Sequence, residues 1–251
     1  MTAPIIPGAE PWSADGGPHG VLVLHGFTGN PNSLRGLAEA FAAAGFAVDL
    51  PLLPGHGTAV EDMVDTGWAD WSACAEERFV ALADRCDRVF VAGLSMGGAL
   101  TAWLATRHAD IAGIICINPL VAAPEGMQEA VTAMLDTGAE FMDGIGSDIA
   151  DPDSVETAYP QTPLRPLFTL FAAADELGAA LGSITCPVLI CTSPQDHVVD
   201  PSNSDVLAAS VAGPVERVTL ERSYHVATLD FDRDLVIERA LAFAAARATA
   251  G

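Results

Sequence analysis

Short apolar runs alternate with longer amphipathic stretches along most of the chain. The runs are rich in β-branched residues and end in turns, a pattern typical of buried strands. In the amphipathic stretches apolar residues recur at the spacing of a helix. The predicted strands are residues 21–25, 46–50, 87–93, 112–120, 187–193 and 214–220, and the predicted helices are residues 33–45, 68–86, 96–108, 201–211 and 232–248. Such alternation predicts an α/β fold with a mostly parallel central sheet flanked by helices.

Two parts of the chain depart from this alternation. Residues 1–19 are rich in Pro and Gly and are predicted to be irregular. In the middle of the chain, two helices at 125–142 and 164–181 are joined by a polar stretch rich in Gly, Asp and Pro. No strand is predicted there, and the region is too long for a simple loop. We therefore expect a small helical cap insertion at 120–182.

This insertion divides the rest of the chain into two pieces of one core, residues 1–119 and 183–251.

The charge balance of the protein restricts the partners that it can bind. The chain has 33 acidic and 11 basic residues, a formal net charge of −22. Nucleic-acid binding needs a basic face that neutralises phosphates, so no nucleic-acid partner is expected. All 11 basic residues are Arg. Without Lys, neither a lysine Schiff base nor a P-loop can form.

The cysteines and the N-terminal residues indicate the cellular compartment in which the protein is expected. The five cysteines include no C-x-x-C pair, and Cys116 and Cys191 lie in apolar runs, as expected of buried free thiols. The first residues lack the basic region and the apolar stretch of a signal peptide. No segment reaches the roughly 20 apolar residues that span a bilayer. We expect a soluble, cytoplasmic protein with no integral membrane segment.

The strongest chemical motif is Gly93-Leu94-Ser95-Met96-Gly97, which follows a predicted strand and opens a predicted helix. The two glycines let the backbone turn sharply, so that the serine occupies the tip of the turn at the carboxyl edge of the sheet. A chance Gly/Ser turn is the alternative, and the strand before and helix after argue against it. We predict that Ser95 is a catalytic nucleophile.

A serine hydroxyl needs a base within hydrogen-bond reach, and the chain has six histidines. His225 follows the last predicted strand, where its ring could reach Ser95. Asp196 follows the preceding strand and would orient that ring, which gives the chain order Ser, Asp, His. His197 is the rival base but is the immediate neighbour of Asp196, and Asp200 is the rival acid but better suits a helix cap. The remaining histidines are expected to have no catalytic role. His19 and His108 are predicted to be exposed to solvent, and His56 is predicted to stabilise its own loop.

Acyl transfer also needs donors for the developing oxyanion. The segment HGFTG, residues 25–29, follows the first apolar strand, and its glycines let the backbone bend so that the N–H of Phe27 can point at the site. Met96, the residue after the nucleophile, offers a second N–H at a helix N-terminus, where the dipole favours negative charge. An ordinary Gly-rich turn is the alternative interpretation of this segment.

The sequence resembles bacterial carboxylesterases and monoacylglycerol lipases of the α/β-hydrolase superfamily in five segments: HGFTG, LPGHGT, GLSMGG, DHVV and SYHVATLD. The resemblance runs from about residue 20 to residue 246 and includes an insertion of similar size. It implies an α/β-hydrolase fold and an ester-cleaving mechanism that requires no metal and no cofactor. The residues it implies are Ser95, Asp196 and His225 as a triad, with Phe27 and Met96 as oxyanion donors.

The resemblance also suggests a substrate, a fatty acyl chain joined to glycerol. The apolar residues of the insertion, with Ile145 among them, could line an acyl channel or only pack against one another and the sheet. Glu156 could accept hydrogen bonds from glycerol hydroxyls, although a solvated glutamate is the commoner case. The apolar residues could also form a homodimer interface or a membrane-docking surface.

Several other functions would use the same residues. A general short- or medium-chain carboxylesterase, a thioesterase, a lactonase or a C–C bond hydrolase would share the triad. The fold also serves as a ligand-binding module without catalysis, but the intact Ser95, Asp196 and His225 argue against that function. A haloalkane dehalogenase is disfavoured, because the resemblance to that group would require Asp where this chain has Ser95.

Overall fold

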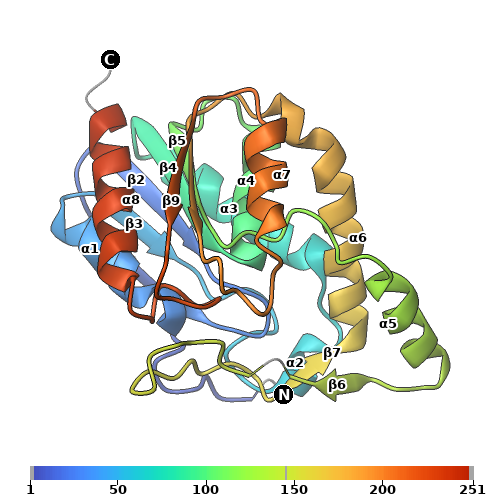
Figure 1. Ribbon diagram of the computed structural model, residues 1–251. Helices are drawn as coiled ribbons and strands as arrows, with labels where there is room; N and C mark the ends of the chain where they lie inside the picture. Colours follow the sequence, from blue (N-terminus) through green and yellow to red (C-terminus); the bar gives the residue numbers. More distant parts are fainter. Residues whose placement is uncertain (1–2, 145, 249–251) are drawn as a thin grey trace.

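The computed structural model describes residues 3–144 and 146–248, and a seven-stranded sheet forms the centre of the molecule (Figure 1). The strand order is β1-β3-β2-β4-β5-β8-β9, and each neighbouring pair is parallel except β1 with β3. The strands are β1 (Trp12–Ala14), β2 (His19–Leu24), β3 (Ala47–Leu50), β4 (Arg88–Leu94), β5 (Gly113–Ile117), β8 (Val188–Thr192) and β9 (Val215–Thr219). The predicted mostly parallel sheet is confirmed.

Helices cover both faces of the sheet. One apolar cluster joins α1 and α8 to the sheet, and the other joins α3, α4 and α7 to the opposite face. These helices are α1 (Arg35–Ala43), α3 (Trp68–Ala83), α4 (Met96–Arg107), α7 (Ser202–Ser210) and α8 (Arg233–Ala248). Alternate residues of β2 point to opposite faces, so Val21 and Val23 join the first cluster and Leu22 and Leu24 the second. Burial on both faces explains why the central strands β2, β4, β5 and β8 are mainly apolar, whereas the edge strand β9 carries exposed polar residues.

The middle segment, 120–182, contains helices α5 (Met127–Asp136) and α6 (Leu164–Ala180) and a two-stranded antiparallel sheet, β6 (Phe141–Asp143) with β7 (Gln161–Pro163). The expectation of no strand here is wrong, because strands of three residues are too short to show a period of two in the sequence. The first helix is also shorter than predicted. It ends before Gly138, whose φ of +84° suits a helix terminus.

Two further elements differ from the prediction near the N-terminal side. The stretch predicted to be irregular contains β1, which pairs with β3 in an antiparallel register that sets Trp12 opposite Leu50. One turn of helix, α2 (Val60–Met63), lies in a segment for which no helix is predicted. Among the helices of the described ranges, none is both long and apolar enough to cross a membrane.

The carboxyl edge of the sheet carries buried polar side chains. A buried polar residue follows each of four adjacent strands: His25 after β2, Ser95 after β4, Asn118 after β5 and Ser193 after β8. His225 lies further along the chain from β9 and is also buried. Ligands of open α/β sheets bind at this edge, so the fold brings the candidate chemistry to one place.

Candidate active site

Ser95 occupies the turn between β4 and α4 with φ +57° and ψ −118°, a conformation that side-chain-bearing residues rarely adopt. Close packing explains the flanking glycines. A Cβ on Gly97 would lie 1.9 Å from the carbonyl oxygen of Leu24, and one on Gly93 would lie 2.0 Å from the carbonyl oxygen of Gly97. The N–H of Ser95 donates to the carbonyl of Ile117 at 3.0 Å. The turn is therefore held rigidly at the sheet edge.

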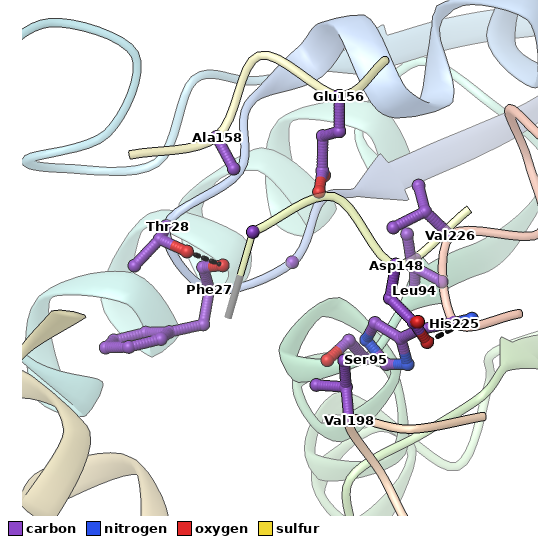
Figure 2. A pocket seen from close by; sticks show the side chains of 12 residues that line it. Phe27, Thr28, Leu94, Ser95, Asp148, Glu156, Ala158, Val198, His225 and Val226 are labelled. Atoms are coloured by element: carbon purple, nitrogen blue, oxygen red, sulfur yellow. Dashed lines mark hydrogen bonds between the residues drawn. The ribbon is translucent and has the colours of Figure 1, made fainter. Parts of the chain in front are cut away.

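Asp196 and His225 form a buried pair beside this turn. Nδ1 of His225 lies 2.7 Å from Oδ2 of Asp196, whose side chain is 1% exposed. The other carboxylate oxygen accepts the N–H groups of Val198 and Val199, both at 2.8 Å. Since Asp196 engages Nδ1, Nε2 is the ring nitrogen left for Ser95. His225 and Ser95 line the same cavity (Figure 2).

The rival residues occupy other places. The ring of His197 is 60% exposed, and its Nδ1 lies 2.8 Å from Asp148 rather than from Asp196. Asp200 accepts the N–H of Ser202 at 2.8 Å at the start of α7, which matches the cap expected of it. His108 was expected to be exposed, and this is wrong. Its side chain is 21% exposed and bonds a carboxylate of the neighbouring α3 at 2.7 Å.

His19 is likewise only partly exposed, because it begins strand β2 and its ring lies 6.3 Å from that of Phe46. His56 is buried, and its Nδ1 lies 3.0 Å from the carbonyl oxygen of Pro54 in its own loop. That contact agrees with the predicted stabilisation of its loop. The edge of the His56 ring also meets Trp71 at a centroid distance of 5.5 Å.

The turn after β2 is fixed by its own histidine. Nδ1 of His25 donates to the carbonyl of Gly26 at 2.9 Å, while Nε2 accepts the N–H of Leu53 at 3.1 Å. The Gly26 carbonyl belongs to the same rigid peptide unit as the N–H of Phe27. A Cβ on Gly26 would be 3.5 Å from Cβ of Ser95, so this peptide lies beside the serine. The structure thus brings both candidate donor residues, Phe27 and Met96, to Ser95.

Burial makes His25 and His56 neutral at physiological pH. It lowers the pKa of His25 from about 6.5 to about 4 and that of His56 to about 3. For His56, the nearby His25 lowers the pKa further. Their rings lie 5.0 Å apart between centroids, so protonating either one would place charge in an apolar region.

This burial predicts a loss of stability in mild acid. Between pH 6.5 and pH 4 the unfolded chain takes up protons on these histidines that the folded chain does not, so the free energy of unfolding falls as pH is lowered. The variant His56→Asn keeps a donor for the Pro54 carbonyl and removes one titrating group. Urea unfolding measured across this window should show a shallower pH dependence in the variant. Equal slopes in the two proteins would contradict the assignment.

Two cavities meet at Ser95. A small cavity of about 50 Å³ contains Ser95 and His225, and its wall combines apolar side chains with the carboxylates of Asp148 and Glu156 (Figure 2). A larger cavity of about 330 Å³ also reaches Ser95 and is mostly apolar. Its apolar lining is Phe27, Leu120, Pro124, Met127, Met142, Leu167, Leu170, Phe171, Val198 and Val199. Ser95 therefore lies between a larger cavity suited to a chain of methylenes and a small cavity whose wall offers carboxylates to a polar group.

Glu156 points its carboxyl group into the small cavity (Figure 2). Burial raises its pKa to about 7, and the nearby His225 opposes that rise. Its Oε1 lies against the backbone of Gly29, where a Cβ would be 2.9 Å away. Ile145, the other residue predicted to contact substrate, lies outside the described residues.

Two residues at this site escaped the sequence analysis. Asp148 accepts the N–H of His225 at 3.0 Å, and Asn118 donates to the carbonyl of the same histidine at 2.8 Å. Asp148 lies in a polar stretch without periodicity and carries no signal that could single it out. Asn118 follows a strand but belongs to no recognisable motif, and its φ of +42° is visible only in the structure.

The parallel sheet, the strained serine turn and the Asp–His pair define an α/β-hydrolase. The chain belongs to the family described as Serine aminopeptidase, S33, whose model matches residues 18–232. That description mentions a peptidase, whereas two similar curated proteins are named as a lipase and a carboxylesterase. The chain is 48% identical to the thermostable monoacylglycerol lipase of Bacillus sp. strain H-257 over 98% of both chains. It is 26% identical to the carboxylesterase of Bacillus subtilis strain 168 over 90% of this chain and 92% of that one.

Solved structures agree with this family. A chain from work on the metagenome-derived lipolytic enzymes LipS and LipT superimposes with a TM-score of 0.92 at 42% identity, over 96% of this chain and 98% of that one. A monoacylglycerol lipase of Paleococcus ferrophilus superimposes with a TM-score of 0.75 at 17% identity, over 93% and 98%, and shares the fold. The protein is thus a carboxylic ester hydrolase of the α/β-hydrolase superfamily.

Proposed function

We propose that this protein hydrolyses monoacylglycerols to a fatty acid and glycerol through an acyl-enzyme on Ser95. The observation that carries the proposal is the position of Ser95 between the larger apolar cavity and the small cavity that holds the carboxylates of Asp148 and Glu156, beside the Asp196–His225 pair. The larger cavity has the apolar lining needed for the acyl chain, and the small cavity offers carboxylates to the hydroxyls of glycerol. The name of the relative that is 48% identical, a monoacylglycerol lipase, supports the same substrate.

In the proposed mechanism, Nε2 of His225 takes the proton of Ser95 Oγ as that oxygen attacks the ester carbonyl. The N–H groups of Phe27 and Met96 hold the oxyanion. Asp196 keeps the proton of the ring on Nδ1 and stabilises the imidazolium that forms. His225 then protonates the leaving glycerol oxygen. Water, activated by the same ring, hydrolyses the acyl-enzyme and releases the fatty acid.

We also propose that residues 120–182 act as the cap that gives this reaction its specificity. Elements α5, β6 and α6 contribute Met127, Met142 and Phe171 to the larger, apolar cavity. The cap loop, which we define as residues 146–160, contributes to the wall of the small cavity. A cap built in this way would bind the acyl chain and the alcohol group of the substrate through separate elements. The cytoplasmic location and the homodimer stay predictions.

Glu156 is proposed to accept hydrogen bonds from the glycerol hydroxyls. We expect the wild type to prefer a 1-monoacylglycerol over the methyl ester of the same fatty acid by tenfold or more in kcat/KM, about 1.4 kcal/mol. Glu156→Ala should remove most of this preference by lowering only the rate with the glycerol ester. Glu156→Gln, which keeps a donor and an acceptor, should retain most of it.

The matched control is Glu129→Ala, which removes an exposed carboxylate from α5 and should leave both rates unchanged. Fatty-acid release from the two esters is measured for each variant. An equal fall in kcat/KM with both esters in Glu156→Ala would contradict a role for Glu156 in binding the glycerol group. Equal turnover of both esters by the wild type would instead identify a general carboxylesterase, as the Bacillus subtilis relative is named.

A further inference from the structure

The main chain of His225 is held on both sides by side chains from outside its own loop. Its N–H donates to Oδ2 of Asp148 at 3.0 Å, and its carbonyl accepts from Nδ2 of Asn118 at 2.8 Å. Asn118 follows β5 in the central sheet, whereas Asp148 belongs to the cap loop. The histidine is therefore fixed partly by the core and partly by the cap.

The same carboxylate also holds the loop that carries Asp196. Oδ2 of Asp148 accepts the main-chain N–H of His197 at 3.1 Å, and Oδ1 lies 2.8 Å from Nδ1 of the His197 ring. The Asp148 side chain is 13% exposed, whereas the His197 ring that it contacts is 60% exposed. One carboxylate thus spans two loops whose separation sets the 2.7 Å contact between Asp196 and His225 (Figure 2 shows the Asp148 end of this bridge).

The cap loop has other attachments that do not use the Asp148 carboxylate. The N–H of Val226 donates to the backbone carbonyl of Asp148 at 3.1 Å. Asp230, which is fully buried, accepts the N–H groups of Ala150, Asp151 and Tyr224 at 2.8, 3.0 and 2.8 Å. Loss of the Asp148 carboxylate should therefore leave the cap loop in place while it removes one of the hydrogen bonds that hold the main chain of His225 and the two contacts between Asp148 and His197.

We propose that Asp148 is a positioning residue through which the cap sets the geometry of the Asp196–His225 pair. Its two oxygens engage three N–H donors of the protein, so its hydrogen-bonding capacity is directed to the two loops. The proposal rests on the function proposed above for Ser95, Asp196 and His225. It adds that the cap governs the rate of the chemical step as well as the fit of the substrate.

Two variants separate positioning from charge. Asp148→Ala removes all three contacts and should lower kcat by about 10- to 100-fold with KM within about twofold, because a small displacement of the base is costly in the transition state and not in substrate binding. Asp148→Asn should keep kcat within about threefold of wild type. Its oxygen can accept the two main-chain N–H groups, and its NH₂ can donate to Nδ1 of His197 in the tautomer with the proton on Nε2.

The matched control is Asp151→Asn, which makes the same change of charge three residues away in the cap loop. Among the residues that the structure describes, its carboxylate accepts hydrogen bonds from Asp153 and Ser154, both in the cap loop, so kcat should be unchanged. A second readout is independent of the ester. The rate at which a fluorophosphonate labels Ser95 should fall in Asp148→Ala as kcat does, and the low-field ¹H NMR signal of the Nδ1 proton of His225 should weaken or shift.

The inference is overturned if folded Asp148→Ala keeps kcat and the labelling rate within twofold of wild type. It is also overturned if Asp148→Asn is as impaired as Asp148→Ala, since charge rather than positioning would then be the cause. Should Asp148→Ala not fold, Asp148→Ser, whose hydroxyl is too short to reach both loops, is judged by the same criteria. A wild type that labels at Ser95 but does not cleave monoacylglycerols would count against the proposed substrate and leave this inference open to the labelling test.

Discussion

Replacing Ser95 with Ala is expected to lower kcat for ester hydrolysis by about 10⁴- to 10⁶-fold. The variant has no nucleophile for the acyl-enzyme, and His225 then has no hydroxyl to deprotonate. The fold should survive, because Ala has the same backbone strain at φ +57° as Ser and the flanking Gly93 and Gly97 are unchanged. Initial rates of fatty-acid release, with far-ultraviolet circular dichroism as a check on folding, measure the effect.

The control for this substitution is Ser13→Ala, at an exposed position in β1, which should leave kcat unchanged. If Ser95→Ala retained activity within tenfold of wild type, the nucleophile would have to be another residue. The proposed acyl-enzyme and the roles of His225 and Asp196 would then all be wrong.

Replacing Asp196 with Asn should lower kcat by about 10³- to 10⁴-fold, the second largest effect. Oδ1 of Asp196 accepts the N–H groups of Val198 and Val199, and an Asn oxygen would keep those bonds. The Asn NH₂ would then face Nδ1 of His225, 2.7 Å from the present Oδ2. Nδ1 would be forced to accept, and the ring proton would move to Nε2, where it blocks the base.

Asp200→Asn is the matched control, because Asp200 is the rival acid in the sequence and lies four residues away. Its carboxylate accepts the N–H of Ser202 at the start of α7, a contact that an Asn side chain can also make. We expect kcat within twofold of wild type for this variant. A loss comparable to that of Asp196→Asn would contradict the assignment of the acid.

The predicted elements of the central sheet agree with the structure because their signals are local. Buried parallel strands are continuous apolar runs such as residues 21–25, and the helices between them show a clear apolar face. The strands β1, β6 and β7 could not be predicted, since strands of three residues carry no detectable period. Their pairing is decided by tertiary contact.

The candidate site shows the same limit. Ser95 could be predicted because two glycines, a strand and a helix surround it within a few residues. The pairing of Asp196 with His225 follows from the order of strands in the sheet. The contacts of Asp148 with the two loops depend on how the cap loop folds back across the sheet edge, and no spacing in the sequence encodes that approach.

The most direct test of the account is to label the protein with a fluorophosphonate, locate the adduct by peptide mass spectrometry and measure the remaining hydrolysis of 1-monoacylglycerol. The account predicts one phosphonyl group per chain on the peptide that contains Ser95, with hydrolysis falling in proportion to the labelled fraction. An adduct on another residue, or full hydrolysis by the fully labelled protein, would contradict it.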